Sequence, residues 1–400
     1  MRTVTQRRWV AGMALVSFIA IGLAGSAQSN VVSIVLTGQS GVQADFRIPT
    51  PEVVAAMKPL LEGDVVFTNL ETSIAMPGQN PQNTPGGGPG FHAPPEGLDA
   101  LMALGVNLIS NANNQAWNLG PVGILNTNRE TKKRNLAMAG SGPTLHDAAA
   151  PAYLKTPKGT IALVAMASGS VPDGAAATET RPGVNELRIE AGGKQCLGSD
   201  PCVGGRPNEA DGKRILQAIR DAKAHADLVV VYQHNHVFPI SYAEISKATP
   251  ERLAPPDWLK AWCHSEIEAG ADVIVLHGPP VLLGVEIYRG RPIFYDQGNF
   301  IFQAPDSIAK NFDSESGIAW RSAASRIEFE GKKLKSITFR PYILNKDAKK
   351  QGDLYIATRG LPMPATGETA RLTLDQLVKL SRPLGTEIEV QGDSARVKLK

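Results

Sequence analysis

The stretch 228–236 reads LVVVYQHNH and decides the fold class. A short apolar run of this kind, preceded by a segment of helical period at 211–226, is typical of a buried strand in an α/β domain. The same order recurs at 272–280, where DVIVLHGPP follows a helical pattern that runs through Glu268. Because such strands and helices alternate along most of the chain, we expect a layered α/β fold.

The pattern changes from Val285 onward. Strand-like runs, such as 326–328 and 336–339, occur with Arg-Gly and Glu-Gly turns in this part of the chain. Short turns of this kind join antiparallel neighbours. We therefore expect the sheet to be partly antiparallel.

The first 27 residues have the order of a secretory signal peptide. Arg7 and Arg8 precede an apolar run from Trp9 to Ala24, and small residues follow up to Ala27. The run is shorter than the roughly 20 apolar residues that span a bilayer. We expect residues 1–27 to be removed, which leaves an exported chain, periplasmic or extracellular, without a stable transmembrane anchor. The arginine pair also resembles a twin-arginine signal.

Charge and cysteine counts exclude two further classes of protein. The 41 basic residues become 38 without Arg2, Arg7 and Arg8, and 38 acidic residues balance them. A neutral body argues against nucleic acid as a partner. Three cysteines cannot form a disulfide framework in 400 residues, although Cys196 and Cys202 could close a short loop in an oxidising compartment.

Polar side chains gather where the predicted strands end. Imidazole, carboxylate and amide donors suit zinc, manganese or iron. Any one of these residues alone is more often a hydrogen-bonded strand end, but together they favour a metal site. They follow five of the predicted strands, in chain order: Gln39, then Glu71, then Asn114 with Gln115, then His234 with His236, then His277.

Several runs give the chain a specific resemblance. TNLET at 68–72, ANN at 112–114, GADVIVLHGP at 270–279 and YDQGNF at 295–300 are similar to segments of the capsule-synthesis CapA family. The resemblance implies a calcineurin-like metallophosphoesterase fold, a four-layer α/β/β/α sandwich. The domain would cover 33–305, with a C-terminal β-rich extension at 306–400 packed on the same sandwich.

The resemblance also implies a function and partners. The family is associated with poly-γ-glutamate capsule synthesis or export, so the expected partners are an anionic polymer or small anionic ligand and the capsule synthesis machinery. Three readings remain: a metal-dependent, phosphoesterase-like hydrolase, a non-catalytic binding module of the cell envelope, and a scaffold whose site is residual.

The sequence departs from the family pattern at one of two expected metal sites. Gln39 stands where the family has Asp, Pro280 where a last His is expected, and Gln115 where His is the expected general acid. The ligands that the resemblance assigns to the other site remain. We therefore expect one divalent ion, Mn, Zn or Fe, held by Glu71, Asn114, His234 and His277. Loss of a general acid typically forfeits roughly 10²–10⁴-fold in rate, so strong phosphatase activity is not expected.

Other residues are candidates for catalysis or substrate contact. His236 can compensate for the lost acid if the chain turns it inward after His234; the alternative is a surface histidine. Asp45 and Arg47 can line the mouth of the site, and Asp45 can also replace the lost carboxylate. The remaining candidates for substrate contact are Gln39, His92 and Asn299, whereas Asp296, which stands where the family has Ser, is expected to be structural.

Overall fold

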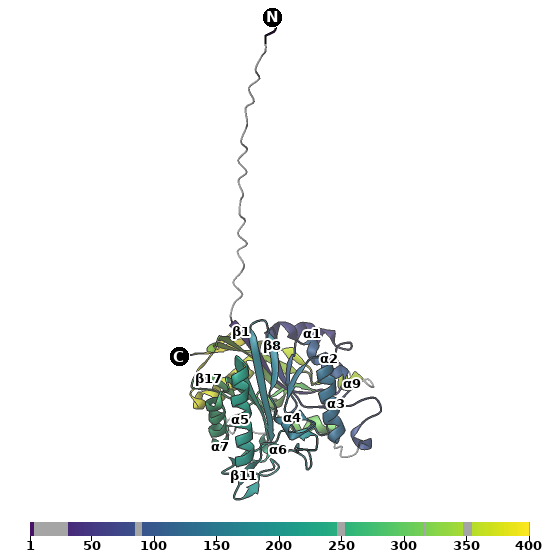
Figure 1. Ribbon diagram of the computed structural model, residues 1–400. Helices are drawn as coiled ribbons and strands as arrows, with labels where there is room; N and C mark the ends of the chain where they lie inside the picture. Colours follow the sequence, from purple (N-terminus) through teal and green to yellow (C-terminus); the bar gives the residue numbers. More distant parts are fainter. Residues whose placement is uncertain (4–30, 85–89, 246–252, 315–316, 347–353, 400) are drawn as a thin grey trace. The chain divides into compact units, whose positions relative to one another are not determined.

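Two β-sheets lie face to face at the centre of the computed structural model (Figure 1). The chain divides into two units, residues 1–30 and 31–400, and both sheets belong to the second. Apart from its first three residues, the predicted signal peptide, 1–27, lies outside the described part of the chain. No helix in that described part has the length and apolar character needed to cross a membrane. The structure describes residues 1–3, 31–84, 90–245, 253–314, 317–346 and 354–399.

The first sheet is mixed and has ten strands. β1 pairs in parallel with β2 on one side and antiparallel with β19 on the other. β18 (Asn299–Phe302) also pairs with β1, and β21 (Pro362–Pro364) pairs with β20. In order, the main path is β22 (Ile388–Gln391), β23 (Ser394–Val397), β20 (Lys333–Leu344), β19 (Arg321–Glu330), β1 (Val31–Gly41), β2 (Val65–Leu70), β5 (Leu108–Ser110) and β6 (Ala137–Ala139).

The second sheet has six strands, with a parallel centre. β14 lies between β9 and β15 and is parallel to both, which explains its continuous run of apolar residues: strands covered on both faces need no alternation. In order, the sheet contains β16 (Val285–Tyr288), β17 (Arg291–Phe294), β15 (Val273–His277), β14 (Leu228–Asn235), β9 (Gly159–Ser168) and β8 (Ala152–Thr156).

Helices cover the outer faces of both sheets (Figure 1). Alternate residues of β14 face opposite sides: Val230 packs between the sheets, whereas Val231 packs with Ile219 of α5 (Glu209–His225) and Trp262 of α7 (Asp257–Ala269). On the other flank, α1 (Pro51–Met57) and α2 (Glu96–Ala103) cover the first sheet. The predicted four-layer α/β/β/α arrangement is therefore confirmed.

The remaining elements are mostly short connections. They include α3 (Gly120–Lys133), α4 (Leu145–Ala149), α6 (Tyr242–Ile245), α8 (Asp306–Ala309) and α9 (Leu354–Thr358), and the strands β3 (Ser73–Ile74), β4 (His92–Ala93), β7 (Ser141–Gly142), β10 (Gly183–Val184), β11 (Ile189–Ala191), β12 (Lys194–Gln195) and β13 (Arg206–Pro207).

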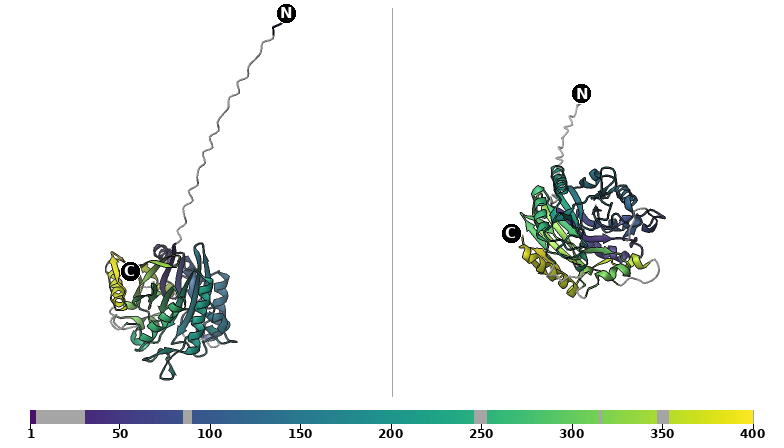
Figure 2. Two further views of the ribbon diagram at one scale, coloured as in Figure 1. Left: turned by 60° about the vertical axis from the view of Figure 1, so that its left-hand side comes forward. Right: turned by 90° about the horizontal axis from the view of Figure 1, so that it is seen from below.

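The segment 306–400 is an integral part of the first sheet. Its long strands β19 and β20 continue that sheet directly from β1, so the expected β-rich extension shares one core with the rest. The segment also contains a helix that the sequence interpretation missed, α10 (Gly367–Ser381), whose Leu374 and Leu377 complete the core between the sheets. Figure 2 shows this yellow helix well away from the blue helices α2 and α3.

Helix α7 buries a carboxyl group against the second sheet. Burial raises the pKa of Glu266 well above its ordinary value of 4.5, so the folded protein keeps this proton to a higher pH than the unfolded chain does. The contribution of the protonated Glu266 carboxyl to the free energy of unfolding is fully present below about pH 4.5. It falls by about 1.4 kcal/mol per pH unit as the pH rises toward the pKa in the folded protein.

We expect Glu266→Gln to remove this dependence. In thermal melts at pH 5, 7 and 8.5, the melting temperature of the variant relative to the parent should rise steadily with pH. A difference that stays constant would mean that Glu266 ionises as freely in the folded chain as in the unfolded chain.

Candidate functional site

The carboxyl ends of strands from both sheets meet at one edge of the molecule. His277, the last residue of β15, donates a hydrogen bond from Nε2 to the carbonyl oxygen of Thr37 in β1, at 3.0 Å. His234 of β14 is the register partner of His277, and Gln39 of β1 is that of Asn69 in β2. The polar residues that follow the strands are thereby brought to the same edge, as the sequence predicted.

Glu71 follows β2 and faces the second sheet. Its backbone N–H donates to the carbonyl oxygen of Ser40, and its Oε1 lies 3.9 Å from Nε2 of His234. Burial raises the pKa of Glu71 to about 8. A buried carboxylate is costly unless an opposite charge accompanies it, so ionised Glu71 requires a cation.

The two predicted histidine ligands are oriented through one ring nitrogen each. Tyr232 places its hydroxyl 3.2 Å from Nδ1 of His234, while His277 uses Nε2 to bond Thr37. Among the described residues, neither Nε2 of His234 nor Nδ1 of His277 has a hydrogen-bond partner. A ring fixed through one nitrogen, with the other left available, is typical of metal-binding histidine.

Both imidazoles are neutral at neutral pH, which is the form that binds metals. Burial lowers the pKa of His277 to about 3. Burial, followed by the charges of His236 and His277, holds the pKa of His234 well below 6.5.

The amide segment after β5 divides into residues with different roles. Asn113 holds the backbone: its Nδ2 donates to Asn69 Oδ1 at 2.9 Å and to the Leu70 carbonyl at 2.8 Å. Asn114 is half-buried, and its Oδ1 lacks a hydrogen-bond partner in the described part of the chain. Asn114 thus retains a free acceptor atom at this edge.

Gln115, predicted as a catalytic residue, has a structural role instead. Its Oε1 accepts hydrogen bonds from Nδ2 of Asn118 at 2.6 Å and from the N–H of Phe91 at 3.3 Å. These bonds fasten the segment before β4. An amide also lacks a titratable proton, so Gln115 cannot replace the general acid that the family has here.

The four predicted ligands fit one divalent ion by the chemistry of their donors. Unsatisfied buried polar atoms cost about 1–3 kcal/mol each, and several at one edge of a sheet call for a common partner. With the side chains in their present positions, however, these residues do not form a complete coordination site. Within the described ranges, no group of three or more His, Cys, Asp or Glu side chains is arranged to hold a metal ion. Two of the four ligands are close to each other: Oε1 of Glu71 lies 3.9 Å from Nε2 of His234.

Gln39, which stands where the family has Asp, is hydrogen-bonded to a second amide, that of Asn299. Nε2 of Gln39 donates to Oδ1 of Asn299 at 3.1 Å, and Nδ2 of Asn299 donates to the carbonyl oxygen of Ala319 at 3.0 Å. Both side chains are nearly sealed from solvent. The side chain of Asn299, a predicted substrate contact, joins β18 to the segment before β19.

The predicted mouth residues bind each other. Asp45 and Arg47 form a two-pronged ion pair with each other, with Nη2 to Oδ2 at 2.7 Å, so both oxygens of Asp45 are engaged and do not replace the lost carboxylate. His92 in β4 is half-buried and lines a cavity of about 470 Å³ together with Gln43 and Glu130.

The side chain of His236 points inward, which is the first of the two alternatives that the sequence left open. Strand β14 ends at Asn235, and the ring centroid of His236 lies 4.6 Å from that of His234. The side chain is buried, and burial lowers its pKa to about 4, against an opposing hydrogen bond with the Gly278 backbone. His236 is therefore a third neutral imidazole at this edge and not a surface histidine.

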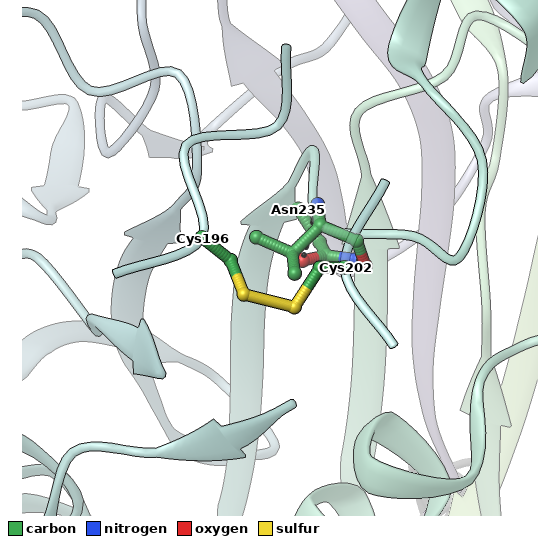
Figure 3. Close-up of a disulfide and its surroundings, with 4 residues drawn as sticks. Cys196, Cys202 and Asn235 are labelled. Carbon is green, nitrogen blue, oxygen red and sulfur yellow. Dashed lines mark hydrogen bonds between the residues drawn. A yellow bond between two sulfur atoms is a disulfide. The ribbon is translucent and has the colours of Figure 1, made fainter. Parts of the chain in front are cut away.

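A disulfide loop packs on His236. Cys196 and Cys202 form the bond that the sequence allowed, and Figure 3 shows it beside Asn235. The N–H of Cys202 donates to the carbonyl oxygen of Phe238 at 2.7 Å. A Cβ on Gly198 inside the loop would lie 2.8 Å from Cβ of His236, so only glycine allows this approach.

We expect the double variant Cys196→Ser, Cys202→Ser to lose about 2 kcal/mol of stability, because the bond closes a short loop in the unfolded chain. Amide exchange at residues 196–202 and at His236 should rise in the variant. Unchanged exchange at His236, measured by mass spectrometry, would show that the loop does not support that residue.

Asp296, which the sequence led us to expect as a structural residue, makes a backbone contact just after β17. It is fully buried; Oδ1 accepts from the N–H of Gly298 at 2.6 Å, and Oδ2 has no partner among the described residues. Burial, and then the charge of Glu71, raises the pKa of Asp296 well above its ordinary value.

Comparisons with known proteins place the chain in a family. Residues 33–304 match the model of a family described as bacterial capsule synthesis protein PGA_cap. The uncharacterized protein y4sH of Sinorhizobium fredii is 28% identical over 417 residues, which is 85% of this chain and 87% of that protein. The PGA biosynthesis protein CapA of Bacillus subtilis is 32% identical over 208 residues, covering 52% of this chain and 45% of that protein.

Among solved structures, a phosphatase of Mycoplasma pneumoniae is similar with a TM-score of 0.45 and 13% identity, over 79% of this chain and 95% of that chain. The family model covers more than half of the sequence and includes the strand ends that carry Gln39, Glu71, Asn114, His234 and His277. The chain therefore belongs to the bacterial capsule synthesis protein PGA_cap family.

Proposed function

We propose that this chain is an exported cell-envelope protein that acts in the synthesis or export of a capsule polymer of the poly-γ-glutamate type. Family membership supports the process, and one relative is named a PGA biosynthesis protein. The signal-peptide pattern supports export, through a twin-arginine or another route. The disulfide between Cys196 and Cys202 supports an oxidising location such as the periplasm or the cell exterior.

We further propose that its cleft holds one divalent ion, Mn, Zn or Fe. The observation that carries this proposal is a set of buried polar atoms without hydrogen-bond partners among the described residues, on Asn114, His234 and His277, together with the carboxyl of Glu71, whose Oε1 lies 3.9 Å from Nε2 of His234. Such an ion supplies a positive charge that polarises an anionic group of the ligand. The half-buried side chain of Asn114 would mark the side from which a ligand approaches, because the other three residues are nearly sealed.

The chain's own residues favour binding and orientation over proton transfer. The amides of Gln39 and Gln115 stand where the family has an acid and a general acid, and both make hydrogen bonds with neighbouring residues. His236 is neutral at neutral pH and could accept a proton but not supply one. These residues also support the second candidate function, a non-catalytic module or scaffold that holds an anionic polymer during envelope assembly.

The test combines binding and turnover. Oligomers of γ-glutamate should bind the metal-loaded protein, and Glu71→Gln should weaken binding at least about tenfold, whereas Glu389→Gln, an exposed carboxyl of β22, should not. A generic phosphodiester should be hydrolysed slowly or not at all. Turnover that Glu71→Gln abolishes would instead establish a hydrolase, and absence of oligomer binding would contradict the polymer function.

A further inference from the structure

A second cavity, of about 530 Å³, lies at the end of the sheets opposite to the candidate site. The site is at the carboxyl ends of β14 and β15. The cavity begins at Arg291, the first residue of β17, which runs parallel to β15 and so starts at the other end of the sheet. The turn between β19 and β20 and the last residues of the chain complete its wall.

The wall of this cavity is strongly basic. Five of its side chains are cationic, and none of the described lining residues is acidic. Two of the cations are already neutralised, because Arg289 pairs with Glu268 at 3.0 Å and Arg291 with Asp272 at 3.2 Å. The other three are Lys332, Lys333 and Lys398, which are exposed and have no ion pair within the described ranges.

The floor of the cavity is apolar. Ile287, Leu334 and Leu399 line it and also pack against the core between the sheets. Thr386 adds an unsatisfied polar group: the residue is 4% exposed, and its Oγ1 has no hydrogen-bond partner in the part of the chain that the structure describes. An apolar floor under a cationic rim suits an amphiphile with a negatively charged head.

The lysine rim lies where β19 turns into β20. Glu330, the last residue of β19, pairs with Val31, the first residue of β1, and Lys332 and Lys333 follow it closely. We propose that this cavity binds the headgroup of an anionic lipid and so holds this end of the domain at a membrane surface, with the candidate site at the far end.

The test uses the chain from Val31 onward, which forms one compact unit with its own cores. It is sedimented with vesicles of phosphatidylglycerol and phosphatidylcholine, or of phosphatidylcholine alone. We expect binding to the anionic vesicles that weakens with salt, since each lysine near such a surface contributes roughly fivefold. Lys332→Gln with Lys333→Gln should weaken it at least about tenfold.

The matched control is the other lysine pair, Lys132→Gln with Lys133→Gln at the end of α3, which makes the same change in net charge. It should leave vesicle binding unchanged. Thr386→Val should weaken binding about threefold, because a diffuse charge attraction would not sense a neutral hydroxyl. Equal losses from both lysine pairs, no effect of Thr386→Val, or binding of poly-γ-glutamate but not of vesicles through Lys332 and Lys333 would each overturn the proposal.

Discussion

Gly278→Ala is expected to destabilise the folded protein by about 4 kcal/mol and to disrupt the candidate site. Gly278 follows β15 with φ +153°, and an added Cβ would lie 1.9 Å from the carbonyl oxygen of Asn235 and 3.1 Å from Cδ2 of His236. Neither backbone nor ring can yield without separating the ends of β14 and β15. Losses of this size are exceptional for one substitution and require such a clash.

The matched control is Gly392→Ala. Gly392 also has a positive φ, +57°, but an added Cβ would meet nothing within 4 Å, so this variant measures the conformational penalty alone, about 1 kcal/mol. Urea unfolding of both variants gives the comparison. Similar losses at the two positions would contradict the close approach of Gly278 to β14.

Glu71→Gln is expected to weaken metal binding by at least about 100-fold, because it removes the carboxylate from the proposed ligand set while keeping its shape. The metal-free variant should be at least as stable as the parent, since the folded protein already holds Glu71 protonated below a pKa of about 8. A chelator competition titration measures the affinity, and a melting curve separates lost binding from lost folding.

Asp296→Asn provides the control for this second prediction. It replaces a buried carboxyl whose pKa is raised by burial and by the charge of Glu71, and which lies outside the proposed ligand set. Its effect on metal affinity should be less than about tenfold. A larger effect than that of Glu71→Gln would assign the ion to Asp296 and refute the proposed set.

The sequence predicts strands best where both faces of the strand are buried, because such a strand shows as a continuous apolar run. The apolar run at 228–232 predicts a strand, and the structure extends this strand to Asn235, because β9 and β15 pair with its polar end as well. Helix α10 was missed because its neighbours in the chain are strands of the first sheet, which led us to treat the whole segment as β-rich.

Side-chain roles were harder to predict, since they depend on segments distant in the sequence. His236 is held inward by Gly198 and Gly278, which approach it from separate loops. Gln115 lost its proposed role to hydrogen bonds from Phe91 and Asn118, and only the second of these is local.

The central proposal is that Glu71, Asn114, His234 and His277 hold one metal ion. Elemental analysis of protein purified without chelators tests it most directly, with His277→Ala and Glu71→Gln measured alongside. The proposal predicts about one divalent ion per chain in the parent protein and almost none in either variant. Two ions per chain, none in the parent, or full retention in both variants would contradict it.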